Sequence, residues 1–168
     1  MDQELEQKIK RAKELLTTSR HISIATVNED GSPHNSPVRL VYDSTLEHIY
    51  WGSHPQSLHS KNIVRTGKIF AVLFDRIERG GLYMRGEDAH ELKGEELEEA
   101  LKIHNEFRVR EGSAPLELSY YTGNSPQRMW GARITNFWVN CADRGPDGHL
   151  IKDGRIEITA KDILECNL

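Results

Sequence analysis

Short apolar runs separated by turn signals recur along this chain, and few amphipathic segments interrupt them. Residues 21–27, HISIATV, alternate and are rich in β-branched side chains, which is typical of a half-buried strand. The Asp-Gly pair at residues 30–31 favours a hairpin turn, and a second strand is expected over residues 35–42. Because strands follow one another without βαβ alternation, the pattern predicts an antiparallel sheet.

The most continuous apolar run, residues 68–75 (KIFAVLFD), predicts a central strand that is covered on both faces. Six or more strands with three helices favour an α+β fold, an antiparallel barrel with helical decoration. The further strands are expected at residues 48–51, 82–92, 132–141 and 155–159.

Apolar side chains at helical spacing predict the three helices. The first spans residues 2–18, and a helix at about 95–108 is inserted between two strands. A short helix begins at Ser57 or Ser60 and runs to Arg65, with Gly67 as its C-cap.

With 168 residues and 37% apolar side chains, the chain is long enough to form one domain, residues 1–168, with a buried core. Its net charge of -4 provides no basic field for nucleic acid. No apolar run approaches the ~20 residues that span a bilayer, and the first segment is charged throughout. We therefore expect a cytoplasmic protein that binds neither nucleic acid nor membrane.

The histidines and cysteines form no motif for a metal site, so we predict none. His54 and His59 lie five positions apart without a carboxylate or cysteine to complete a ligand set. His104 lies on the apolar stripe of the third helix and is expected to pack there. The chain has no G-x-S-x-G for a hydrolase and no G-x-G-x-x-G for a bound dinucleotide.

Ser60 and Lys61 lie where the short helix begins. A helix N-terminus favours an anion, and the lysine adds a cation. Alternatively, Ser60 caps a surface helix and Lys61 is simply solvated. The residues of this stretch alone leave both interpretations open.

Four motifs follow one another in a distinctive order: IATVNEDGSPHNSPV, IYWGS, HSKNI and IFAVLFD. This order resembles the pyridoxamine 5'-phosphate oxidase-like family of FMN-binding split β-barrels. The later segments GLYMRGEDAHEL and RITNFWVN are also similar to that family. The resemblance implies a homodimer that binds FMN in clefts at the subunit interface.

The same resemblance implies the contacts of the flavin. It assigns Ser60 and Lys61 to the phosphate, and the backbone of Trp51 and Gly52 to the isoalloxazine ring. Residues 36–41 match the strand beneath the flavin, whose expected contacts are Ser36, Val38, Arg39, Leu40 and Val41.

Two tryptophans lie in the C-terminal region, which in this family reaches toward the partner's flavin. We expect Trp138 to pack, whereas Trp130 is either a packing aromatic or a further flavin contact, and it is included among the expected contacts. Arg128 and Arg133 either meet an anionic substrate group or pair with the acidic residues 95–99.

The resemblance implies an FMN-dependent oxidoreductase with a small-molecule substrate. That substrate stays open, because the C-terminal RIEITAKDILECNL lacks the signature of the vitamin B6 oxidases. Hydride transfer is the flavin's own chemistry, so no catalytic acid or base is assigned. A nicotinamide cofactor would bind against the flavin as a diffusible substrate. The alternatives are a flavin-binding protein for storage or sensing, or the same barrel with deazaflavin or haem.

Overall fold

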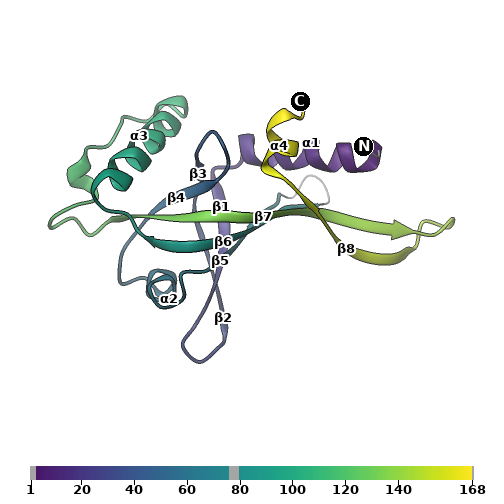
Figure 1. The fold of residues 1–168 in the computed structure, drawn as a ribbon, viewed down its shortest axis with the longest axis horizontal. Helices are drawn as coiled ribbons and strands as arrows, with labels where there is room; N and C mark the ends of the chain where they lie inside the picture. The colour runs from purple at the N-terminus through teal and green to yellow at the C-terminus, as the bar shows by residue number, and fades with distance from the viewer. Residues whose placement is uncertain (1–2, 76–79, 168) are drawn as a thin grey trace.

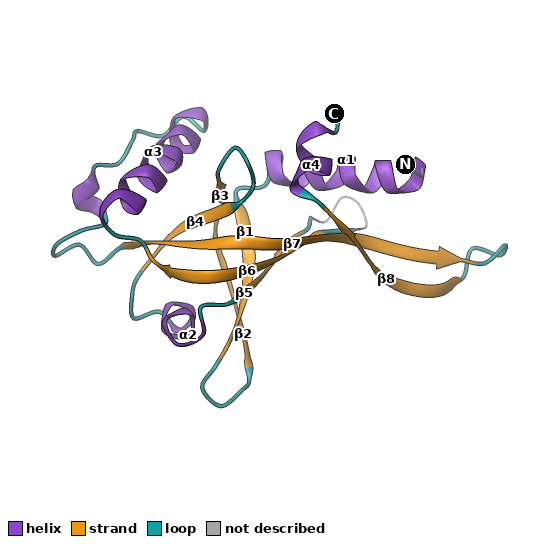
Figure 2. Ribbon diagram, in the orientation of Figure 1, coloured by secondary structure: helices purple, strands orange, loops and turns teal. Residues whose placement is uncertain are grey.

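The computed structural model describes residues 3–75 and 80–167, which form a strongly curved sheet with helices around it (Figure 1). The strands, orange in Figure 2, follow the order β2-β1-β5-β6-β7-β4-β3, with β8 paired to β7. Every ladder is antiparallel, as predicted. The elements are α1 (Gln3–Thr18), β1 (His21–Val27), β2 (Pro33–Arg39), β3 (Val41–Tyr42), β4 (His48–Ser53), α2 (Leu58–Thr66), β5 (Ile69–Leu73), β6 (Leu82–Glu91), α3 (Gly94–Arg110), the 3-10 helix η1 (Leu118–Tyr120), β7 (Arg128–Arg144), β8 (Leu150–Ile158) and α4 (Ala160–Glu165).

The chain itself joins the two ends of this sheet. The strand predicted at residues 35–42 is divided by Leu40 into β2, which pairs with β1, and β3, which pairs with β4. Within the described residues, no ladder joins β2 to β4. The sheet therefore closes into a barrel that is split between β2 and β4. This split-barrel α+β fold is the fold class that the sequence predicted.

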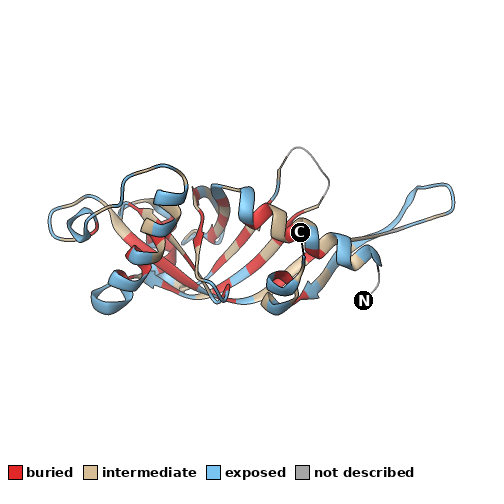
Figure 3. Ribbon diagram, turned by 90° about the horizontal axis from the view of Figure 1, so that it is seen from above, coloured by how far each residue is buried: buried red, intermediate tan, exposed pale blue. Residues whose placement is uncertain are grey.

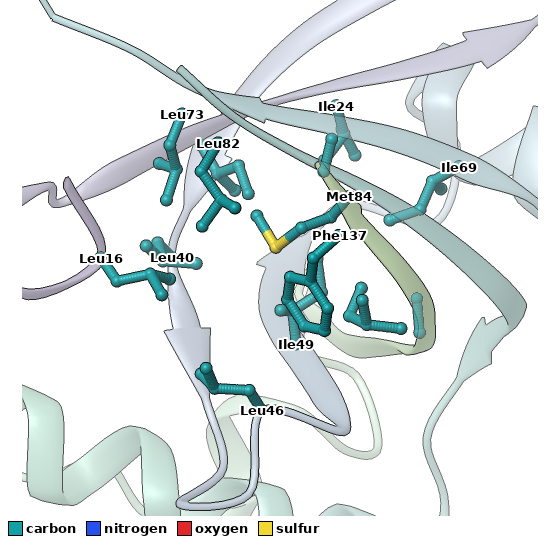
Figure 4. Close-up of a cluster of buried hydrophobic side chains, with 14 of the residues drawn as sticks. Leu16, Ile24, Leu40, Leu46, Ile49, Ile69, Leu73, Leu82, Met84 and Phe137 are labelled. Carbon is teal, nitrogen blue, oxygen red and sulfur yellow. The ribbon is translucent and has the colours of Figure 1, made fainter. Parts of the chain in front are cut away.

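The core lies inside the curve of the sheet. Ile24 of β1, Ala71 of β5 and Met84 of β6 are at most 1% exposed, and they belong to one continuous cluster (Figure 4). Buried positions alternate with half-buried or exposed positions along the strands (Figure 3). The predicted N-terminal helix is α1, whose expected start at residue 2 lies outside the described residues. Its buried face adds Ile9, Ala12, Leu15 and Leu16 to the core.

The expectation that residues 68–75 are covered on both faces is wrong for the single chain. Ala71 and Leu73 are buried, but Phe70 and Val72 are only half-buried and Phe74 is 66% exposed. An antiparallel sheet needs packing on one face only. The unbroken apolar run therefore marks an outer face that the chain leaves uncovered.

The predicted short helix is α2, and Ser57 is its N-cap residue. Gly67 ends it in the left-handed conformation (φ 63°) and donates its backbone N–H to the carbonyl oxygen of Ile63 at 2.8 Å. The predicted glycine C-cap is confirmed.

The predicted inserted helix is α3. With η1 it forms an excursion between β6 and β7, residues 94–127, that we call the insertion. The insertion packs on the barrel wall through a second apolar cluster, next to the half-buried Tyr50 of β4. The cluster consists of Leu92, Leu97, Ala100, Leu101, Tyr121 and Met129.

The C-terminal region differs most from the sequence prediction. The strand expected at residues 132–141 is the longer β7, and its hairpin with β8 projects beyond the barrel (Figure 1). The helix α4 was not predicted, although Thr159 and Asp162 form a reciprocal capping box at its start. None of the helices that the structure describes has the length and apolar character needed to cross a membrane.

Candidate functional site

The split between β2 and β4 is bridged by a histidine of α2. His59 places Nδ1 3.2 Å from the hydroxyl of Ser36 on β2, and Nε2 2.8 Å from the hydroxyl of Ser53 on β4. Ser57 Oγ lies 3.2 Å from the same Nε2 and donates to Ser60 Oγ at 2.8 Å. We call these five residues the hydroxyl cluster. It connects the two strands where the barrel has no backbone ladder.

Burial and a neighbouring histidine keep His59 uncharged. Its side chain is 8% exposed, and desolvation lowers its pKa, with a smaller contribution from the nearby His34. His34 Nε2 in turn lies 3.0 Å from Ser36 Oγ. Neutral His59 therefore has one N–H donor and one acceptor nitrogen, and the serine hydroxyls can match either tautomer.

The N-terminus of α2 adds backbone hydrogen-bond donors next to the hydroxyl cluster. The side chain of Ser57 makes no cap hydrogen bond, and the first helical bond here runs from Lys61 N–H to the Ser57 carbonyl oxygen at 3.1 Å. The preceding N–H groups of the first turn have no partner within the helix. Such groups, together with the helix dipole, favour an anion. Lys61, the neighbouring cation, is exposed.

Most of the ten predicted flavin contacts lie inside the barrel wall. Ser36, Arg39 and Gly52 are partly exposed, and Lys61 is exposed. The hydroxyl of Ser60 is enclosed with the hydroxyl cluster, so a ligand can reach Ser57 more readily than Ser60. The six others are between 0% and 6% exposed: Val38, Leu40, Val41, Trp51, Ser60 and Trp130.

The insertion covers two of the partly exposed contacts. The Tyr121 ring lies over Gly52, where a Cβ atom would come 3.0 Å from the tyrosine hydroxyl. Glu111, just after α3, holds Arg39 at 2.6 Å. In this arrangement the Tyr121 ring occupies the outer side of Gly52. The α2 N-terminus, by contrast, has backbone donors without a partner in the helix and a nearby cation, which suit a phosphate.

Trp130 and the two arginines have partners within the chain. Trp130 donates its indole N–H to the Ser53 carbonyl oxygen at 3.3 Å. Arg133 forms two hydrogen bonds to the Asp88 carboxylate, and Arg128 lies 3.7 Å from Glu91. Neither arginine is paired with residues 95–99 as one alternative expected.

Sequence reasoning missed three members of the hydroxyl cluster: Ser53, Ser57 and His59. The sequence pointed to His59 only as a possible metal ligand, and no group of three or more potential metal ligands occurs among the described residues. The available signal was local, because His59 lies two positions after an N-cap serine and so in the first helical turn. Its partner Ser36 is 23 positions away in sequence, and only the fold brings the two together.

No protein-family model matches this chain, and a comparison with curated proteins found no significant match to its sequence. Solved structures do share its fold. One is a haem-binding protein from Mycobacterium smegmatis, with 15% identity and a TM-score of 0.64. The match covers 94% of this chain and 60% of that protein. Thus the chain spans about three fifths of the length of that protein.

Two further structures match over most of their own length. A Clostridium acetobutylicum protein related to general stress protein 26 of B. subtilis, of the pyridoxine phosphate oxidase family, has 13% identity and a TM-score of 0.60. The match covers 91% of this chain and 96% of that one. The haem storage protein HutZ from Vibrio cholerae has 15% identity and a TM-score of 0.61, covering 77% of this chain and 92% of its own. At such identities the likeness establishes the split-barrel fold.

Proposed function

We propose that this split-barrel protein is an FMN-dependent oxidoreductase whose flavin phosphate is held at the N-terminus of α2. One observation supports this most directly: backbone donors of the first turn, the Ser57 hydroxyl and the exposed Lys61 lie together beside the split of the barrel. A phosphate needs several hydrogen-bond donors and a cation, and this place offers both.

In this proposal the chain's own residues bind and orient, and bound FMN supplies the hydride chemistry. The hydroxyl cluster fixes the start of α2 relative to β2 and β4, so the phosphate donors are pre-organised. The neutral His59 contributes positioning without adding charge. Tyr121 of the insertion covers Gly52. The proposal therefore assigns the contacts with the isoalloxazine ring to residues outside the insertion.

A first experiment identifies the cofactor. The protein purified from cells is expected to be yellow and to release FMN on heat denaturation, identified by its mass. Reduced nicotinamide should bleach the bound flavin, and air should restore its colour. Flavin that binds but never bleaches indicates storage or sensing, and release of a deazaflavin identifies the second cofactor alternative. A haem Soret band, the outcome that the haem-binding neighbours suggest, would overturn the FMN proposal.

We also propose a homodimer, formed through the uncovered outer face of β5, β6 and β7. Phe70 lies 6.4 Å from Tyr83 and 6.0 Å from Trp138, measured between ring centroids. Arg155 lies over Tyr83 at 3.7 Å, and Arg85 over Trp138 at 5.5 Å. These three rings are half-buried, and aromatic and arginine side chains are enriched among the residues that dominate protein interfaces. A second copy is the proposed occupant because the FMN cleft is expected between subunits.

Light scattering tests this homodimer. The wild-type protein is expected to be dimeric at micromolar concentration, and Phe74→Glu should shift it toward the monomer by burying an unpaired charge. Val109→Glu on α3 is the matched control, because Val109 is similarly exposed (60%, against 66% for Phe74) and lies away from this face. A monomeric wild type, or equal effects of the two variants, would contradict the proposal.

A further inference from the structure

A cavity of about 340 Å³ lies between α3 and the strands β4, β6 and β7, away from the α2 N-terminus. Its floor is made of small and apolar residues, Leu92, Gly131 and Ala132. Tyr50 and His48 line the β4 side, and Glu96 and Glu99 line the α3 side. Its volume falls in the range of small-molecule sites, about 300–1,000 Å³, as does its combination of an apolar floor with a few polar groups.

The floor is shaped by the absence of a side chain at Gly131. A Cβ atom there would come 3.1 Å from Leu92 and 3.2 Å from Tyr50, which is tighter than ordinary contact. Glycine thus allows β7 to pack closely beneath these two side chains.

The β6 wall of the cavity is an irregular strand. The pairing of β6 with β7 shifts register between Glu87 and His90, and Asp88 has a positive φ of 52°. The bulge directs the Asp88 carboxylate to Arg133, at 2.7 and 3.0 Å, and its carbonyl oxygen to His90 Nδ1, at 2.6 Å. Asp88 and Arg133 therefore neutralise each other, while His90 is oriented by the backbone.

This orientation determines what His90 presents to a ligand. Because Nδ1 must carry a proton to donate to the Asp88 carbonyl, Nε2 is the nitrogen that titrates. Nε2 lies 3.2 Å from the Glu96 carboxylate. When His90 is neutral, a lone pair and a carboxylate oxygen face each other, and both need a hydrogen-bond donor. A protonated amine supplies such donors.

The other polar groups that line the cavity also favour a cationic ligand. Arg133 is paired with Asp88, and His48 Nδ1 lies 2.9 Å from Asp43 behind it. Glu96 and Glu99 are one helical turn apart on α3, and no lysine or arginine among the described residues forms an ion pair with either of them. Burial, with Asp43, Glu99 and Glu96 nearby, raises the pKa of Tyr50 to about 12, so its hydroxyl stays protonated.

The helix dipole offers a simpler explanation for part of this lining. Glu95 and Glu96 belong to the acidic first turn of α3, where carboxylates stabilise a helix without any ligand. That explanation does not account for Glu99, for the cavity beside these carboxylates, or for the convergence of His90 from another element.

We propose that this cavity binds a small organic cation, a primary amine with a short apolar body, between His90, Glu96 and Glu99. The apolar body would lie on the floor of Leu92, Gly131 and Ala132, and the ammonium group would face the α3 carboxylates. The site is independent of the proposed flavin site, because it shares no residue with the hydroxyl cluster.

The proposal predicts a pH dependence. The hydrogen bond to the Asp88 carbonyl, followed by the contact with Glu96, raises the pKa of His90 above 6.5. Below that pKa the histidinium donates its Nε2 proton to the Glu96 carboxylate. An ammonium group can then take this place only if His90 loses that proton. The groups that face His90 are the charged side chains of Asp88 on β6, Glu96 and Glu99 on α3 and Arg133 on β7, and the titratable side chain of His48 on β4. Amine affinity should therefore rise from pH 6 to pH 8.5.

Titration of the full chain with butylamine, followed by the backbone amide NMR signals of Leu92, Gly131 and Ala132, tests the site. Saturable shifts are expected with butylamine, and much smaller ones with butan-1-ol or butyrate. Glu96→Gln and Glu99→Gln should each weaken binding roughly tenfold, as loss of a charge-assisted contact does. Glu98→Gln removes the same charge from an exposed α3 position outside the cavity lining and should leave binding unchanged.

Equal shifts with butan-1-ol would overturn the proposal, because the cavity would then select for apolar bulk alone. An equal loss of affinity in Glu98→Gln would also overturn it, because the amine would then respond to the overall negative charge of α3. So would a butylamine affinity that does not rise with pH. These readouts do not involve a flavin, so the outcome is separate from that of the FMN proposal.

Discussion

Replacing Trp130 with alanine is expected to destabilise the fold by about 3–5 kcal/mol, the usual cost of removing a large buried aromatic side chain. Trp130 is 0% exposed and belongs to the main core cluster. The substitution also removes the indole N–H that donates to the Ser53 carbonyl oxygen. Urea unfolding monitored by circular dichroism should show the loss as a lower midpoint with an unchanged slope.

Trp130→Phe provides the matched variant, since it keeps an aromatic ring and loses mainly the indole hydrogen bond. It should retain most of the stability and most of the bound cofactor. The opposite pattern, in which Trp130→Ala loses flavin without losing stability, would show that Trp130 contacts the flavin. The sequence left open whether Trp130 packs or binds.

Lys61→Ala should weaken FMN binding roughly ten- to a hundredfold and leave riboflavin binding unchanged. Losing a charge-assisted contact to a phosphate costs about 1.5–3 kcal/mol, and riboflavin has no phosphate. Because Lys61 is exposed, its truncation should not disturb the core. Affinities for both ligands can be measured from flavin fluorescence quenching on the apoprotein.

Two serine variants and a second lysine sharpen this comparison. Ser57→Ala should cost FMN affinity about 1 kcal/mol as a neutral hydrogen bond does, and Ser60→Ala less, because the Ser60 hydroxyl is enclosed. Lys68→Ala removes an equal charge from an exposed position beyond the C-cap of α2 and is the control. If riboflavin affinity falls as far as FMN affinity in Lys61→Ala, the proposed phosphate site is wrong.

The sequence by itself determined the elements whose signals are local. Alternation at residues 21–27 specified β1, and helical periodicity specified α1 and α3. Gly67 marked the end of α2, because a left-handed C-cap is readily adopted by glycine. The short helix α4 was missed although its capping box is also a local signal.

The succession of strands without βαβ alternation predicted an antiparallel α+β barrel, and the resemblance carried by the order of motifs implied its split form. Neither determined which face of β5 is covered. Phe74 has the same apolar character whether it is buried or exposed, and only the position of the helices decides which it is.

Only the tertiary structure decided the chemistry of the sites. His59 bridges Ser36 and Ser53, Tyr121 covers Gly52, and His90 meets Glu96 across two elements. The bulge at Asp88 aims that histidine, and no periodicity in the sequence marks it. Each of these contacts depends on strand register and on how the insertion packs. Local propensity therefore specified the elements, while the juxtaposition of side chains from different elements was fixed only when the barrel closed.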